Sequence, residues 1–276
     1  MNPRRSGAIT VAQRSSGRIG QGLIVVNWSA INRRSTVGRL LRGPLNAIPK
    51  STVVPILSGP NRGFKWCVGS ADHGCWLGSY ELEKQRAIWR LRREGATALD
   101  VGANVGYYTL LLSRAVGPSG RVIAIEPDPR NADRIRFHAR VNRVSHIHVV
   151  EGVAAARSGA ATFSAGPTPT TGRIALDGVG EEVRAYTLDD IVFGDDAHVP
   201  SIVKMDIEGG ESAALVGASL LLAARQTTWF VALHSDEQAE FCIATFRRHG
   251  YRVCFPDGAE IPRRCSAEIS EIVAIA

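Results

Sequence analysis

The segment "VKMDIEGGE", residues 203–211, places ionisable side chains at the end of an apolar run. Successive side chains of a strand point to opposite faces, so Lys204, Asp206 and Glu208 are predicted to share one face. Charged groups on a strand covered on both faces are costly unless they are paired or lie at an open end. We therefore expect Asp206 and Glu208 in a cleft at the carboxyl end of the strand, where a carboxylate can accept a proton. An ion pair between Lys204 and Asp206 is the structural alternative.

His234 ends the next apolar run, "TWFVALH", and is the third candidate for proton transfer. Its imidazole titrates near neutral pH, which suits a general base. We rank Asp206 first as the base and Glu208 or His234 next, with a structural hydrogen bond as the simpler role for His234. Glu211 is interpreted as a helix start, where the helix dipole favours an acid. Clustered carboxylates can hold Mg²⁺, but this spacing does not require an ion, and no metal is included in the predicted site.

The second informative segment is the glycine-bearing loop "DVGANVGYYT", residues 100–109, whose two glycines are spaced G-x-x-x-G. Glycines let a backbone approach a bound nucleotide at a helix N-terminus. Asp100 precedes this loop, and a fixed carboxylate there would repel a pyrophosphate by several kcal/mol. The same carboxylate favours a ligand with a positive end, which points to S-adenosyl-L-methionine and away from NAD. The predicted cofactor-binding residues of this segment are Asp100, Gly102, Asn104, Gly106 and Thr109.

Further cofactor contacts are expected at the ends of the next two apolar runs. Glu126 ends "RVIAIE", and an acid at such a strand end can accept hydrogen bonds from both ribose hydroxyls. Two prolines follow and are expected to delay the next helix until about Asn131. Val153 follows the third run and is placed near the adenine, although an ordinary turn fits there equally well.

These candidates need an alternation of strands and helices to bring them together, and the chain has one from about residue 96 onward. Apolar runs that predict strands alternate with helical patterns, which is typical of a parallel sheet covered on both faces. The run 211–225 is predicted to be one helix, and residues 154–198 are predicted to hold short strands. Before this part, residues 53–66 predict two strands joined by a turn, and residues 79–95 predict a helix that ends at Gly95.

The motifs "DVGANVGYYT", "IEPDPRN", "TLDD" and "VKMDIEGGE" together resemble the FkbM-type methyltransferases, over roughly residues 65–255. The resemblance implies a Rossmann-like class I methyltransferase fold, with a seven-stranded, mostly parallel sheet, a reversed last strand and helices on both faces. It implies methyl transfer from S-adenosyl-L-methionine, usually to an oxygen, with a hydroxyl on a sugar, glycolipid or secondary metabolite as acceptor. The glycine loop, Asp100, Glu126 and Asn131 carry over as cofactor-binding residues. His234 departs from the acid found near this position in many members.

The net positive charge of the chain comes from its first quarter. Residues 1–71 contain eleven Lys or Arg and no acid, whereas the remainder has 22 basic and 26 acidic residues, a net charge of −4. We expect residues 1–50 to be a basic, partly disordered leader, residues 51–95 to pack on the core, and residues 96–276 to form the cofactor-binding domain.

Several other classes fit the sequence less well. A basic arm suits RNA, but the body is acidic, lacks an N-P-P-[YF] motif and has His234 where ribose methyltransferases carry a second lysine, so a nucleic-acid partner is disfavoured. A non-catalytic cofactor-binding module stays as an alternative. Five cysteines without a C-x-x-C pair argue against a zinc ribbon or a disulfide framework and favour the cytoplasm. No apolar run is long enough to cross a bilayer, and the sequence is silent on oligomeric state.

Overall fold

The computed structural model describes residues 43–164, 172–174, 179–194, 198–262 and 269–276, so most of the expected basic leader lies outside the described residues. Its centre is a seven-stranded sheet. The strands, in spatial order, are β12 (Arg252–Cys254), β13 (Glu271–Ile275), β11 (Thr228–Ala232), β10 (Ile202–Met205), β3 (Thr97–Val101), β4 (Arg121–Glu126) and β5 (Ile147–Glu151). The β13 strand is antiparallel to both its neighbours, whereas the pairs from β11 to β5 are parallel. This confirms the predicted fold class, including the reversed last strand.

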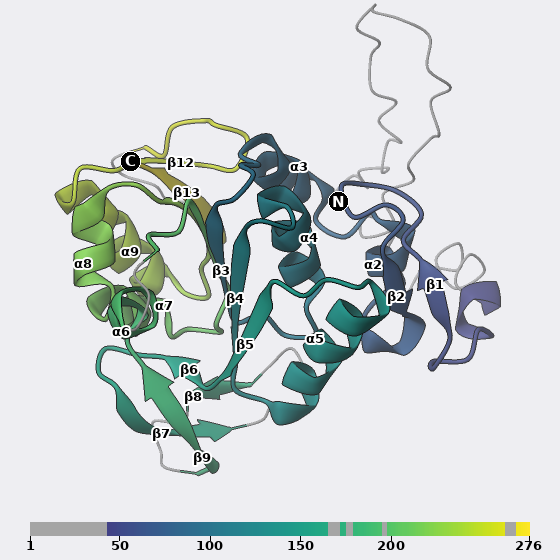
Figure 1. Cartoon of the computed structure of the whole chain (residues 1–276). Helices are drawn as coiled ribbons and strands as arrows, with labels where there is room; N and C mark the ends of the chain where they lie inside the picture. Colours follow the sequence, from purple (N-terminus) through teal and green to yellow (C-terminus); the bar gives the residue numbers. More distant parts are fainter. Residues whose placement is uncertain (1–42, 165–171, 175–178, 195–197, 263–268) are drawn as a thin grey trace, which may run out of the picture.

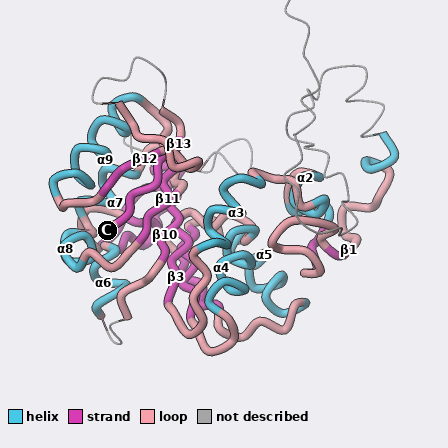
Figure 2. Tube along the Cα trace, turned by 90° about the horizontal axis from the view of Figure 1, so that it is seen from above, coloured by secondary structure: helices cyan, strands magenta, loops and turns pink. Residues whose placement is uncertain are grey.

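Helices cover both faces of this sheet, as Figures 1 and 2 show. One face carries α3 (Leu82–Arg90), α4 (Tyr107–Val116) and α5 (Pro129–Val141), and the other carries α6 (Leu188–Phe193), α7 (Glu211–Val216), α8 (Ser219–Ala224) and α9 (Asp236–Arg248). The central strands β3, β10 and β11 are buried along almost their whole length, which is why their sequences are mostly apolar. Charged residues within them therefore need partners.

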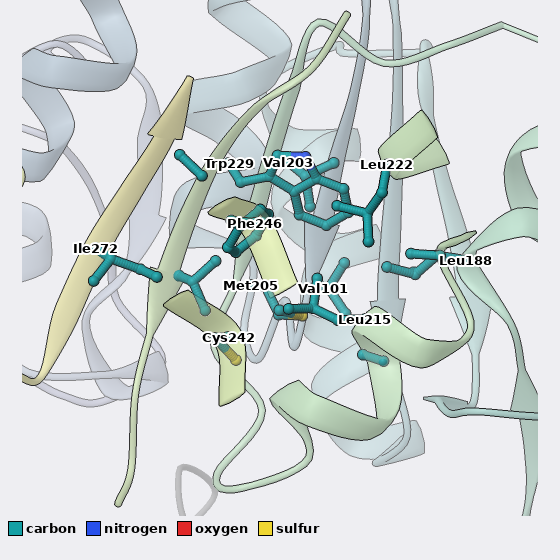
Figure 3. Close-up of a cluster of buried hydrophobic side chains, with 14 of the residues drawn as sticks. Val101, Leu188, Val203, Met205, Leu215, Leu222, Trp229, Cys242, Phe246 and Ile272 are labelled. Atoms are coloured by element: carbon teal, nitrogen blue, oxygen red, sulfur yellow. The ribbon is translucent and has the colours of Figure 1, made fainter. Parts of the chain in front are cut away.

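The larger hydrophobic core lies between the sheet and the second group of helices (Figure 3). Trp229 of β11 and Phe246 of α9 are fully buried there, with ring centroids 5.5 Å apart. Val203 and Met205 point into this core from β10. Their neighbour Lys204 must then point to the opposite face, toward α4, because side chains alternate along a strand.

Two smaller units flank the central sheet. The predicted hairpin forms as β1 (Val53–Pro55) paired with β2 (Lys65–Cys67), followed by a 3-10 turn (Val68–Ser70) and α2 (His73–Leu77). It packs on α5 through Trp66, whose ring stacks on His138 at 4.0 Å. The predicted short strands form a second sheet of β6 (Val153–Ala154), β9 (Glu181–Tyr186), β7 (Gly159–Ser164) and β8 (Arg173–Ile174).

The structure corrects three predicted helix boundaries. The run 211–225 forms two helices, because the chain turns at Gly217, whose carbonyl accepts from the Asp189 N–H at 3.0 Å instead of continuing the helix. The missing side chain of Gly217 also lets the Ala155 carbonyl approach closely. The new helix α8 begins under the Asp189 carboxylate, which accepts from the backbone N–H groups of Leu220 and Leu221 at 2.9 Å. The "TLDD" motif thus contains a cap for a distant helix.

The other two corrections concern α3 and α5. The α3 helix ends at Arg90 rather than Gly95, because the N–H groups of Arg93 and Gly95 bond to carbonyls at the end of α4. The α5 helix begins at Pro129 and not near Asn131, since proline is well suited to the first helical position and Asp128 caps it. Among the helices that the structure describes, none has the length and apolar character that crossing a bilayer requires.

Candidate active site

The glycine loop joins β3 to α4 and is shaped by left-handed backbone conformations. Gly102, Asn104 and Gly106 have φ values of 72°, 50° and 89°. At Gly102 the requirement for glycine is steric, because a Cβ atom would lie 2.0 Å from the Asp206 carbonyl oxygen. The loops after β3 and β10 therefore touch through their backbones, which brings the glycine loop and the acidic segment to one place.

Asp100 lies beneath the loop and is completely buried. Its Oδ2 accepts a hydrogen bond from the Thr109 hydroxyl at 2.6 Å, and its Oδ1 is 3.2 Å from the Lys204 ammonium. Lys204 also donates to the Gly102 carbonyl at 2.8 Å. Burial lowers the pKa of Lys204, but the nearby carboxylates, Asp100 foremost, outweigh it and hold that pKa above the ordinary value.

This arrangement changes the electrostatic argument made from the sequence. The negative charge of Asp100 is balanced by Lys204, so it does not act as a bare carboxylate that selects a positive ligand. Lys204 pairs with Asp100 and not with Asp206, the alternative considered from the sequence, because the parallel pairing of β10 with β3 sets Lys204 beside Asp100. Asp100 and Thr109 support the loop from below.

Glu126 ends β4 and is held by three donors. Its Oε2 accepts from the Asn104 backbone N–H at 2.7 Å, and its Oε1 accepts from the Asp128 N–H at 3.0 Å and the Asn131 side-chain amide at 3.2 Å. Burial raises the pKa of the Glu126 carboxyl, although these hydrogen bonds oppose the shift. Asn131 thus positions Glu126, and the carboxylate keeps lone pairs for a ligand.

A cavity of about 1020 Å³ lies over these loops. Of the residues predicted from the sequence, those that line it are Gly102, Asn104, Glu126, Val153, Asp206 and Glu208. The predicted residues that are not among those lining it are Asp100, Gly106, Thr109, Asn131 and His234. The first set forms the surface that a ligand meets; of the second set, Thr109 holds Asp100 and Asn131 holds Glu126.

The acidic segment reaches the cavity in a way that strand alternation did not predict. The β10 strand ends at Met205, so Asp206 and Glu208 lie in the following turn, where Glu208 has a φ of 52°. The Nε2 atom of His234 is 3.5 Å from Asp206 Oδ1 and 3.6 Å from Glu208 Oε2. The ligand atoms of these three residues all lie within 4.8 Å of one another, so the turn gathers them into one cluster.

Glu211 is a site residue whose role the sequence did not reveal. It begins α7 as predicted, but it is fully buried and its Oε1 lies 2.7 Å from His234 Nδ1. This hydrogen bond raises the pKa of His234, against the effect of burial, and Glu208 and Asp206 add to the rise. Burial raises the pKa of Glu208. An acid at a helix start is expected in any case because it stabilises the helix dipole. The sequence therefore does not show that this acid is also buried against a histidine.

The cavity has a second wall, far in sequence from the acidic turn. It comes from the segment before the glycine loop, where the lining residues include Leu45, Ile48, Lys50, Val68, His73, Tyr80 and Glu81. Glu81 accepts from the Tyr108 hydroxyl at 2.7 Å and pairs with buried Lys84 at 2.8 Å. Tyr80 and Glu81 both contribute to this cavity wall.

Comparison with known proteins identifies the family. A family model described as "Methyltransferase FkbM domain" matches residues 100–253, more than half of the chain. The human "Transmembrane O-methyltransferase" is 45% identical over 51 residues, which are 18% of this chain and 18% of that protein. "Protein-L-isoaspartate O-methyltransferase 2" of Archaeoglobus fulgidus is 37% identical over 60 residues, 22% of this chain and 27% of that protein. The matches span less than a third of either relative.

Similar solved structures include the methyltransferase FkbM from Methylobacillus flagellatus KT, at 19% identity and a TM-score of 0.45, covering 74% of this chain and 55% of that one. A SAM-dependent O-methyltransferase from Thermotoga maritima has 13% identity and a TM-score of 0.41, covering 70% of this chain and 64% of that one. The family match confirms what the sequence motifs indicated: the chain belongs to the FkbM methyltransferase family, and its cofactor is S-adenosyl-L-methionine.

Proposed function

We propose that this protein transfers the methyl group of S-adenosyl-L-methionine to a hydroxyl oxygen of a sugar, glycolipid or secondary metabolite. The observation that carries the proposal is the single cavity shared by Glu126 and the Asp206–Glu208 turn. Pockets for one small molecule measure roughly 300–1,000 Å³. A cavity of about 1020 Å³ is at the top of that range, so it has space for an acceptor beside the cofactor.

The cofactor fits the wall formed by the glycine loop and Glu126. The cofactor, when bound, supplies an electrophilic methyl carbon on a sulfonium. Glu126 is fixed by the backbone of Asn104 and by Asn131, so it can accept hydrogen bonds from ribose hydroxyls without reorganising. The missing side chain at Gly102 lets the Asp206 backbone approach the loop, which sets the acidic turn beside this wall. Val153, which also lines the cavity, is the proposed apolar contact for the adenine.

Methyl transfer to a hydroxyl is an in-line displacement, so the protein aligns the oxygen and takes its proton. Asp206 is the proposed base, because it lines the cavity on the loop that touches Gly102. Glu208 lines the same wall, and the Nε2 atom of His234 lies 3.5 Å and 3.6 Å from the carboxylate oxygens of Asp206 and Glu208. Glu211 orients His234 by fixing its Nδ1 atom.

The acceptor is proposed to be a molecule with both apolar and polar parts. The second wall of the cavity offers the apolar side chains of Leu45, Ile48 and Val68 next to Lys50 and His73. Such a mixed wall suits a hydroxylated metabolite or a sugar with an apolar portion better than a nucleic-acid backbone. We keep the cytoplasm as the proposed location, because the four described cysteines are all unpaired.

Calorimetric titration with S-adenosylhomocysteine and, separately, with NAD⁺ tests the cofactor part of the proposal. Binding of the first alone supports it, and binding of NAD⁺ alone contradicts it. A screen of hydroxylated acceptors with methyl-labelled cofactor then tests the reaction. Asp206→Asn should lower turnover by about 10²–10⁴-fold with little change in S-adenosylhomocysteine affinity, as expected for loss of a general base. Methylation restricted to RNA or to nitrogen acceptors would overturn the assignment to hydroxyl oxygen.

A further inference from the structure

The cluster formed by Asp206, Glu208 and His234 carries more negative charge than its one imidazole can neutralise. Three carboxylates surround the one imidazole, counting Glu211 on its other side. Lys204, a buried cation two residues before Asp206, is paired with Asp100 and bound to the Gly102 carbonyl. Even with a protonated imidazole, the group of four carries an excess of negative charge.

The second observation is the fixed orientation of His234. The Glu211 carboxylate is fully buried and its Oε1 lies 2.7 Å from Nδ1, so Nδ1 carries the proton and donates it. Oε1 of Glu211 also accepts from the Gly209 backbone N–H at 3.2 Å, whereas its buried Oε2 has no hydrogen-bond partner among the described residues. A buried carboxylate on the far nitrogen of a histidine is the outer-shell arrangement that orients metal-ligating imidazoles. The Nε2 atom then faces Asp206 and Glu208.

The distances from His234 Nε2 to the two acids suit an ion between the ligands. Nε2 is 3.5 Å from Asp206 Oδ1 and 3.6 Å from Glu208 Oε2, longer than the usual 2.7–3.2 Å of an N–H···O hydrogen bond. Two atoms that each lie about 2.1 Å from one Mg²⁺ or Mn²⁺ ion are roughly 3–4 Å apart. The contacts are therefore too long for direct hydrogen bonds and within the range expected of ligands that share a cation.

From this geometry we propose that Asp206, Glu208 and His234 bind a divalent cation of the Mg²⁺ or Mn²⁺ class, with Glu211 as the outer-shell residue that positions His234. Two oxygen ligands out of three favour these ions, and three protein ligands leave coordination positions for water and for the acceptor oxygen. The proposal rests on the proposed function, because Asp206 and Glu208 line the cavity in which the acceptor is placed. A cation there would hold the acceptor hydroxyl and lower its pKa, and the second Asp206 oxygen would remain to take the proton.

The test is Mn²⁺ binding to chelator-treated protein in the presence of saturating S-adenosylhomocysteine. Binding is measured as the decrease of the electron paramagnetic resonance signal of free Mn²⁺. The parent is expected to bind one equivalent. Asp206→Asn and His234→Gln should weaken binding at least tenfold, and Glu211→Gln should weaken it about 10–100-fold by releasing the imidazole. Glu240→Gln, which changes an exposed acid of α9, is the matched control and should bind like the parent.

Calorimetry with S-adenosylhomocysteine on each variant shows that the fold and the cofactor site are intact, and it separates the two proposals. A parent that binds S-adenosylhomocysteine but no Mn²⁺ would overturn the cation site and leave the proposed function standing. Equal Mn²⁺ affinity in the parent and in both ligand variants would also overturn it. Mn²⁺ binding that depends on these residues, in a protein that does not bind S-adenosylhomocysteine, would instead contradict the proposed function.

Discussion

Lys204 of β10 and Asp100 of β3 form an ion pair across two neighbouring parallel strands, with 3.2 Å between Nζ and Oδ1, beneath the glycine loop. Both side chains are buried, and each makes a second contact, Asp100 with Thr109 and Lys204 with the Gly102 carbonyl. The pair connects the two strands whose ends form the cofactor wall and the acidic turn. Its main role is therefore to fix the relative position of these two loops.

The Asp100→Asn variant should be strongly destabilised. Removing one partner of a buried ion pair leaves the other charge uncompensated, which costs about 3–5 kcal/mol. The double variant Asp100→Asn, Lys204→Met should recover a large part of that loss, because it removes the stranded ammonium. Urea unfolding of the parent, both single variants and the double variant measures this. Additive effects of the two single changes would show that the pair is not coupled.

Glu126→Gln should weaken S-adenosylhomocysteine binding by roughly 10–100-fold, since hydrogen bonds to a charged group contribute about 1.5–3 kcal/mol. Glu151→Gln is the matched control. Glu151 lies directly beside Glu126 in the β4–β5 register, but it is half-exposed and pairs with Arg136. Calorimetric titration should show parent-like affinity for Glu151→Gln. If both variants bind like the parent, Glu126 does not contact the cofactor.

Gly102→Ala should destabilise the protein and abolish cofactor binding, because the added Cβ atom would sit 2.0 Å from the Asp206 carbonyl oxygen. Gly63→Ala is the control that shows the effect of backbone strain without a clash. Gly63 also has a positive φ, 88°, yet nothing lies within 4 Å of a Cβ atom there, so only about 1–2 kcal/mol of left-handed strain is expected. Thermal melts and calorimetry compare the two variants. Similar losses in both would mean that the close approach of the loops is unimportant.

The free energy of unfolding should fall as the pH drops from about 6.5 to about 4, because of His138. Burial lowers the pKa of this imidazole to about 4, although its contact with the Val105 carbonyl opposes the shift. Nδ1 bonds to that carbonyl and Nε2 accepts from the Cys67 N–H, so the folded state has no place for a second proton. The unfolded chain takes up the proton first, near its ordinary pKa of about 6.5, and stability decreases below that pH.

The size of this pH effect follows from the width of the interval. The His138 pKa is about 6.5 in the unfolded chain and about 4 in the folded protein, and this interval corresponds to roughly 3 kcal/mol of stability. That stability is fully present above about pH 6.5 and is lost by about pH 4. Urea unfolding at several pH values measures it in the parent and in His138→Gln. The variant should be less stable at neutral pH and should show a smaller slope over this interval. An unchanged slope would assign the pH dependence to other groups.

Much of the fold was predictable from local patterns in the chain. Apolar runs such as 202–205 and 228–232 are too hydrophobic to be exposed and too short for most helices, and their alternation with amphipathic stretches leaves few arrangements other than a doubly covered parallel sheet. The loop at Gly102 and the carboxylate of Glu126 were recognisable because a glycine turn and a strand-end acid are local features. Together with the motif resemblance, these features were sufficient for the family.

The partners of the buried charges were decided only by the tertiary structure. Lys204 pairs with Asp100, 104 positions away, because strand order sets β10 beside β3, whereas the sequence shows only that Asp206 is near. In the same way, only the fold brings His234 within hydrogen-bond distance of Glu211. It also places the segment around Leu45 and Ile48 in the cavity wall. A buried charge must find a counter-charge in three dimensions, and neither spacing nor composition specifies which one it meets.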